Sequence, residues 1–185
     1  MRSADADAVD DESALVVYES SFGNTAKVAE AVADGLGRHM PVRVVAVDEP
    51  GARQEADDTL VVVGGPTHAF SMSRPRTRRE AQERADTLPR DTAGIRDWID
   101  MLPADRPDRL YATFDTRVAG ARHLPGSAAR AAERELRRGG HRTVVHGESF
   151  YVADVEGPLL PDEAERARAW GEHLAREAAD VRRRP

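Results

Sequence analysis

Cysteine is missing from this sequence of 185 residues. The chain therefore has no disulfide, no thiol nucleophile and no thiolate-bound metal or iron–sulfur cluster. No apolar run reaches the length of a membrane span, and the acidic start MRSADADAVDDES lacks the apolar stretch of a secretory signal. We therefore expect a cytoplasmic protein that is not associated with a membrane.

The sequence also has fewer basic than acidic residues, 27 against 33, which gives a net charge of −6. This balance argues against general nucleic-acid binding. The six histidines are scattered, with no pair at metal-ligand spacing, and the Gly-x-Ser-x-Gly motif of hydrolases is absent. We predict no metal site and assign no catalytic residue.

Apolar runs and helical patterns alternate along the chain. Buried strands are predicted at residues 14–18, 42–47, 60–65, 110–115 and 143–152, the last with a break possible at Gly147. A helical pattern with Val28, Val32 and Leu36 follows the first strand, and others follow at residues 92–102, 127–138 and 161–181, with a short helix from about Pro75. Such alternation implies a parallel sheet with helices on both faces. We predict one domain over residues 14–181, a disordered leader at 1–13 and a frayed tail at 182–185.

The first predicted strand runs directly into a loop rich in hydroxyl groups, ESSFGNT (19–25), and then into a helix. Free amides and the positive dipole end make a helix N-terminus attractive to anions. The loop has neither the lysine of an ATP-binding loop nor the three glycines of a dinucleotide fingerprint. It suits a phosphomonoester held by neutral donors, although ordinary helix capping explains the same residues equally well.

Two later loops lie at the same predicted edge of the sheet. In GGPTHAF (64–70), the two glycines could leave room for a flat ligand, with His68 and Phe70 stacking on it. In FDTRVAG (114–120), Asp115 and Thr116 could bond its polar edge, and Arg117 could offset negative charge. The alternatives are a core-filling Phe70, a solvated His68, and a capped strand end with a surface arginine.

With these three loops in order, the sequence resembles the flavodoxin-like family, which binds flavin mononucleotide (FMN). The motifs that carry the resemblance are YESSFGNT (18–25), VVVGGPTHAF (61–70) and ATFDTRVAG (112–120). The resemblance implies a three-layer αβα sandwich with a five-stranded parallel sheet in the order 2-1-3-4-5. It implies that the FMN phosphate is held by Ser20, Ser21, Phe22, Gly23, Asn24 and Thr25. It also implies that the isoalloxazine ring is enclosed by Pro66, Thr67, His68, Ala69, Phe70, Asp115, Thr116, Arg117 and Gly120.

The sequence departs from the family pattern in three places. Phe22 stands where a hydroxyl residue is usual, although its backbone N–H could still donate. Val118 is near the point where electron-carrier members place a stacking tyrosine, so one face of the ring could be open. The third departure is a long insertion, residues 66–91, with five arginines and two glutamates between residues 74 and 84. If the insertion lies over the flavin, its charge should raise the redox potential; otherwise it is a solvated linker or lid.

Three functions remain open at this point. The first is an electron carrier between a reductase and an acceptor, and the second is an NAD(P)H-dependent FMN oxidoreductase of the quinone reductase type. The third is an FMN-free interaction domain that keeps the fold. The partner is accordingly a redox protein or NAD(P)H, and the sequence does not give the oligomeric state.

Overall fold

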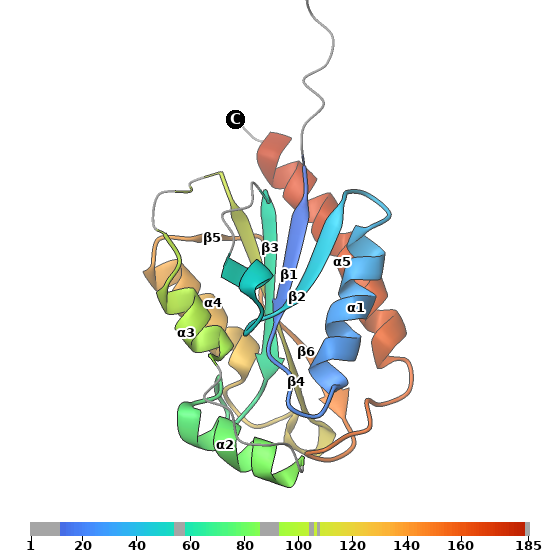
Figure 1. The fold of residues 1–185 in the computed structure, drawn as a ribbon. Helices are drawn as coiled ribbons and strands as arrows, with labels where there is room; N and C mark the ends of the chain where they lie inside the picture. Colours follow the sequence, from blue (N-terminus) through green and yellow to red (C-terminus); the bar gives the residue numbers. More distant parts are fainter. Residues whose placement is uncertain (1–11, 54–57, 86–92, 104–105, 107, 184–185) are drawn as a thin grey trace, which may run out of the picture.

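Strands and helices alternate along the chain in the computed structural model, which describes residues 12–53, 58–85, 93–103, 106 and 108–183 (Figure 1). The strands are β1 (Ala14–Tyr18), β2 (Val42–Ala46), β3 (Leu60–Pro66), β4 (Leu110–Val118), β5 (Arg142–Thr143) and β6 (Glu148–Val152). The helices are α1 (Asn24–Leu36), α2 (Pro75–Arg84), α3 (Ile95–Asp100), α4 (Ala128–Arg138) and α5 (Glu163–Arg183), with short 3-10 helices η1 (Pro50–Arg53) and η2 (Ala119–Ala121).

All strand pairs in the sheet are parallel, and the order is β2-β1-β3-β4-β5, with β6 also paired to β4. The predicted fifth strand is therefore divided into two strands, β5 and β6, which both pair with β4. Gly147 lies in the break, where a Cβ would be 2.7 Å from the Thr113 hydroxyl and 2.9 Å from the Ala129 side chain. The predicted fold class and strand order are confirmed.

The alternation of side chains along the central strands creates one apolar core on each face of the sheet. Helices α1 and α5 cover one face, and α3 and α4 cover the other (Figure 1). Phe114, Phe150 and Trp170 form an edge-to-face cluster on the first face, with ring centroids 5.9 to 6.2 Å apart. On the second face, Trp98 is buried and its indole N–H donates to the Ala52 carbonyl at 2.7 Å. Both tryptophans thus pack toward the sheet.

Several element ends differ from the prediction. β4 continues to Val118 because it pairs with β6 beyond the predicted end at residue 115. α5 reaches Arg183, and Arg182 forms an ion pair with Glu12 at 2.6 Å, so the predicted leader and tail touch in their described parts. Residues 1–11 and 184–185 of these segments lie outside the described residues. Among the helices described, none is both long and apolar enough to cross a membrane.

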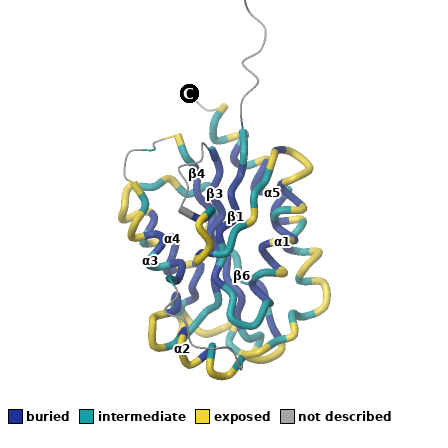
Figure 2. Tube along the Cα trace, viewed as in Figure 1, coloured by how far each residue is buried: buried dark blue, intermediate teal, exposed yellow. Residues whose placement is uncertain are grey.

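The carboxyl ends of β1, β3 and β4 lie at one edge of the sheet, and α2 lies across this edge (Figure 1). The strand order reverses between β1 and β3, because β2 lies on the other side of β1. Ligands of open α/β sheets bind at such a reversal, outside the carboxyl ends of the strands. β1, β3 and β4 are buried up to their last residue, whereas parts of the loops and of α2 at this edge are exposed (Figure 2).

Candidate functional site

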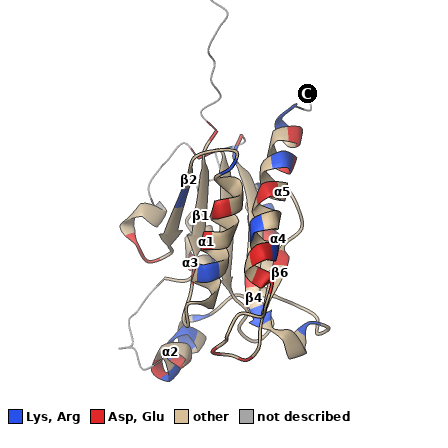
Figure 3. Ribbon diagram, turned by 90° about the vertical axis from the view of Figure 1, so that its right-hand side faces the viewer, with Lys and Arg blue, Asp and Glu red and all other residues tan. Residues whose placement is uncertain are grey.

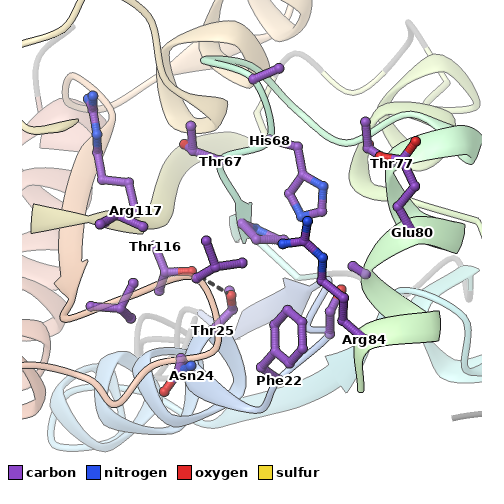
Figure 4. A pocket seen from close by; sticks show the side chains of 17 residues that line it. Phe22, Asn24, Thr25, Thr67, His68, Thr77, Glu80, Arg84, Thr116 and Arg117 are labelled. Atoms are coloured by element: carbon purple, nitrogen blue, oxygen red, sulfur yellow. Dashed lines mark hydrogen bonds between the residues drawn. The ribbon is translucent and has the colours of Figure 1, made fainter. Parts of the chain in front are cut away.

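A pocket of about 310 Å³ opens at the carboxyl edge of the sheet (Figure 4). Its volume is at the lower end of the range for small-molecule sites. Among the predicted site residues, those that line it are Ser21, Phe22, Asn24, Thr25, Pro66, Thr67, His68, Ala69, Thr116 and Arg117. The other lining residues were not among the predicted site residues: Thr77, Glu80, Ala81, Arg84, Val118, Val152 and Val155.

The loop before α1 is open beside Gly23. Gly23 has a left-handed backbone with φ of 80°, and a Cβ built there would meet no atom within 4 Å. The Ser20 hydroxyl accepts from the amides of Gly23 at 3.1 Å and Ala26 at 3.4 Å. Its own hydrogen stays available, because a hydroxyl donates one bond as well as accepting. Ser20 and Gly23 thus support the loop without lining the pocket.

A buried pair of hydroxyls joins this loop to β4. Thr25 and Thr116 lie 2.7 Å apart, oxygen to oxygen, and both are almost fully buried. One hydroxyl donates to the other, which leaves one hydrogen for a ligand. In Figure 4 the pair lies at the floor of the pocket, between the start of α1 and the end of β4.

The loop between β6 and α5 also reaches the site. The Asn24 amide donates to the Glu156 carbonyl at 3.0 Å, and a Cβ on Gly157 would be 2.6 Å from the same amide. This contact fixes the loop that brings Val155 to the pocket. No local sequence signal identified this wall, because it depends on a contact between segments 132 residues apart.

The two glycines at the end of β3 do not make room for a ligand. A Cβ on Gly64 would overlap the Phe114 ring at 2.0 Å, and a Cβ on Gly65 would lie 2.6 Å from Ile95. The space beside both glycines is therefore filled by protein side chains. The prediction of a flat ligand against this backbone is wrong, and the pocket lies further along the loop, from Pro66 to Ala69.

The loop after β3 ends in a tight turn. The backbones of His68 and Ser71 exchange hydrogen bonds of 2.9 and 3.0 Å, and Ala69 and Phe70 between them have φ of 46° and 64°. His68 lines the pocket, whereas Phe70 is half exposed and does not. Burial, together with the Arg78 guanidinium, lowers the pKa of His68 below its ordinary value, so the ring is neutral at pH 7.

The end of β4 places its polar residues in different directions. Asp115 is fully buried, and its carboxylate accepts from the Ala129 amide at 2.8 Å, at the start of α4. Burial raises the pKa of this carboxyl group. Arg117 lies along the pocket wall and donates to the carbonyls of Ala121 and Leu124. Gly120 is exposed in η2 and does not line the pocket.

Helix α2, which contains most of the arginines of the insertion, forms one side of the pocket. Its residues Thr77, Glu80, Ala81 and Arg84 recur at helical spacing and face the cavity. In Figure 4, Arg84 extends toward His68 above the ring of Phe22. The insertion is therefore neither a solvated linker nor remote from the site in its described part, and Arg84 is its only arginine there that lines the pocket.

Arg78 points away from the pocket and anchors α2 to the domain. Its guanidinium donates to the Asp97 carboxylate at 2.8 Å and to the Ser73 hydroxyl at 3.1 Å. The buried Glu19 carboxylate lies beside it and accepts from the Ile95 amide at 3.1 Å. Burial raises the pKa of Glu19, against the opposing effects of Ser73, Ile95 and Arg78. This cluster ties α2 and α3 to Glu19, the first residue of the hydroxyl loop.

Comparison with known proteins finds a family model that matches part of the chain. Residues 16–93 match the model of the flavodoxin family. The matched stretch includes the hydroxyl loop and the loop after β3, but it ends before β4. No curated protein matches the chain in sequence.

Solved flavodoxins share the fold over most of the chain. A flavodoxin from the Archaea is 16% identical, covers 90% of this chain and 99% of its own, and has a TM-score of 0.61. Flavodoxin from Streptococcus pneumoniae is 19% identical, with coverage of 91% and 99% and a TM-score of 0.60. Oxidised flavodoxin 2 from Bacillus cereus is 17% identical, with the same coverage and a TM-score of 0.61.

Proposed function

Because the chain is flavodoxin-like in its sequence and its fold, we propose that it binds FMN at the start of α1 and carries electrons between a reductase and an acceptor protein. The observation that supports this most is the composition of the pocket. Three loops that are far apart in sequence, 20–25, 66–70 and 115–120, each contribute lining residues at the point where the strand order reverses. A bound flavin would supply the redox chemistry there.

The start of α1 has the donors that a phosphomonoester needs. The first amides of a helix have no carbonyl partner within the helix, and the dipole favours an anion beside them. The Ser21 hydroxyl and the Thr25–Thr116 pair add neutral donors, and the space beside Gly23 is open. These groups fit a phosphate dianion that binds without a metal ion.

The rest of the pocket suits a flat aromatic ring. Pro66, Ala69, Val118, Val152 and Val155 give it apolar walls. The wall at Phe22 is also apolar, so this residue would pack against the ligand where a hydroxyl would bond it. A neutral His68 and the Arg84 guanidinium would meet the polar edge of the ring or the ribityl chain.

One observation favours the NAD(P)H-dependent oxidoreductase as a second candidate. Val118 lines the pocket. The wall where electron-carrier members of the flavodoxin-like family place a stacking tyrosine is therefore aliphatic here. An uncovered ring face would admit a nicotinamide for hydride transfer.

The visible spectrum of the purified protein separates these functions. We expect an FMN spectrum that persists when NADPH is added without oxygen and bleaches when a flavodoxin reductase is also present. Bleaching by NADPH alone would identify the oxidoreductase. Colourless protein that does not take up added FMN would refute both and leave an interaction domain.

The phosphate site can be tested by comparing FMN with riboflavin, which lacks the phosphate. Thr25→Val should weaken FMN about ten- to a hundredfold, since a hydrogen bond to a charged group contributes about 1.5–3 kcal/mol, and should leave riboflavin unchanged. Thr113→Val is the matched control, because this buried hydroxyl donates to the Ala129 carbonyl away from the pocket. Quenching of flavin fluorescence measures both affinities. Equal losses for both ligands would contradict a phosphate at Thr25.

A further inference from the structure

The surface beside the pocket differs in charge from the rest of the molecule. We infer that the residues on the α2 side of the pocket mouth form a docking surface for an acidic face of a partner protein, an inference that rests on the proposed electron-carrier function. The surface, here named the basic patch, consists of the exposed residues Phe70, Arg74, Arg76, Arg79, Arg84, Arg122 and Leu124.

Charge is the first observation behind this inference. The protein as a whole carries −6, yet arginines outnumber acids on the two exposed segments that make up the basic patch. Within the described residues of these two segments, only Glu80 and Glu83 oppose them, and Glu80 is already paired with Arg76 at 2.9 Å. Among the described residues, Arg74, Arg79 and Arg122 have no carboxylate partner for their side chains. Figure 3 shows the arginines of α2 at this end of the molecule.

Exposed apolar side chains are the second observation. Phe70 is 50% exposed and Leu124 is 48% exposed, whereas Phe114 and Phe150, which lie in the sheet, are fully buried. An aromatic group among arginines is typical of the centre of a protein interface, where both residue types are enriched. A dinucleotide would bind to the arginines but would leave the exposed side chains of Phe70 and Leu124 without a role. A protein partner therefore explains more of the surface.

The backbone holds Phe70 in place at a cost. Non-glycine residues rarely adopt positive φ, yet both Ala69 and Phe70 do so in the turn that His68 and Ser71 close. Such strained residues cluster at functional sites. The turn also touches the second segment of the patch, because a Cβ on Gly126 would lie 2.6 Å from the Phe70 carbonyl oxygen. The two segments therefore present one continuous surface next to His68 and Ala69 of the pocket.

Electron transfer to two haem proteins of opposite charge tests this inference on the FMN-loaded protein. The fully reduced, anionic flavin would deliver one electron to each of two ferric haems and release one proton to the buffer. We expect the second-order rate with acidic cytochrome b5 to fall as ionic strength rises, because opposite charges steer association. The rate with basic cytochrome c should rise or stay constant. The opposite pattern with salt would overturn the inference.

Charge reversal gives the residue-level test. Arg74→Glu with Arg79→Glu should slow reduction of cytochrome b5 about tenfold at low salt, within the range of electrostatic steering. Arg176→Glu on α5, an exposed arginine away from the pocket, is the control for the change in net charge. Similarly, Phe70→Ser should lower the rate about fivefold, a typical effect of removing an interface anchor. Met101→Ser, at a residue 54% exposed and outside the pocket, should not.

The possible outcomes separate the two proposals. Protein that binds FMN but shows equal rates for the patch variants and their controls would refute the docking surface alone. A patch variant that instead raises the KM for NADPH in direct reduction would also refute it and would assign the arginines to a dinucleotide. Protein that binds no FMN would remove the proposed function and the docking surface together.

Discussion

Replacing Arg78 with methionine should destabilise the protein far more than the same change at the next residue, Arg79. Arg78 is 8% exposed and lies between three polar partners, the carboxylates of Asp97 and Glu19 and the hydroxyl of Ser73. Arg79 is exposed and has no partner for its side chain in the described part of the chain. Methionine keeps much of the length of the side chain, so the comparison isolates the guanidinium.

The size of the effect follows from what Arg78→Met leaves behind. Two donated hydrogen bonds are lost, and the buried Glu19 carboxylate loses the cation beside it. Removing one partner of a buried ionic cluster costs about 3–5 kcal/mol, because the remaining charge is left uncompensated. Exposed substitutions such as Arg79→Met stay within about 0.5 kcal/mol. The two variants should therefore differ by at least about 2.5 kcal/mol.

The cost should also depend on pH in a defined direction. Burial raises the pKa of Glu19 in the folded state above its unfolded value, so the folded protein binds the proton more tightly. Stability then falls as the pH rises from the unfolded pKa through the folded pKa. Loss of the Arg78 cation raises the folded pKa further, so the cost of Arg78→Met should be larger at pH 8 than at pH 5.

Urea denaturation followed by far-ultraviolet circular dichroism gives the unfolding free energy at each pH. Glu19→Gln is the second variant, since it removes the charge that Arg78 compensates and keeps the shape. In this background Arg78→Met should lose most of its pH dependence. A cost below 1 kcal/mol, or one that is the same at pH 5 and pH 8, would show that the cluster does not anchor α2.

Two further predictions concern the flavin environment and the helix layer. Arg84→Gln should lower the two-electron reduction potential of bound FMN. The potential falls by about 30 mV for each tenfold loss in the ratio of the affinities for reduced and oxidised FMN. Arg79→Gln should leave the potential unchanged, and spectroelectrochemical titration measures both variants. Gly35→Ala should destabilise the protein by about 1–3 kcal/mol despite its better helix propensity, because the new Cβ would lie 2.1 Å from the Arg168 carbonyl of α5. A rise in melting temperature for Gly35→Ala would contradict this close helix contact.

The sequence was sufficient for the fold because the central strands are nearly continuous apolar runs and the helices carry local start signals. Ser127, for example, was predicted to begin a helix, and its hydroxyl accepts from the Arg130 amide at 3.3 Å. The order of the sheet came from the resemblance of three loops to a known family, and it is confirmed. Strand ends were less predictable, since β4 extends only because β6 pairs with it.

The walls of the pocket were only partly predictable, and the misses have a common physical cause. The hydroxyl loop could be predicted because its strand–turn–helix signal is contained in one short stretch of sequence. Val155 and Arg84 reach the pocket through contacts between distant segments, such as the bond from Asn24 to the Glu156 carbonyl. Gly64 was misinterpreted for the same reason, because the Phe114 ring that fills the space beside it comes from another strand.

The position of α2 links the properties that these experiments measure separately. Arg78 fixes the inner side of the helix to Glu19, the first residue of the hydroxyl loop, while Arg84 lines the pocket and Arg79 faces outward. A change on the inner side should therefore alter stability and FMN affinity together, because the helix and the loop share one buried cluster. A change on the outer side should alter only the rate with a partner protein. If Arg79→Glu weakened FMN as much as Arg78→Met does, the division of α2 into an anchoring side and a docking side would be incorrect.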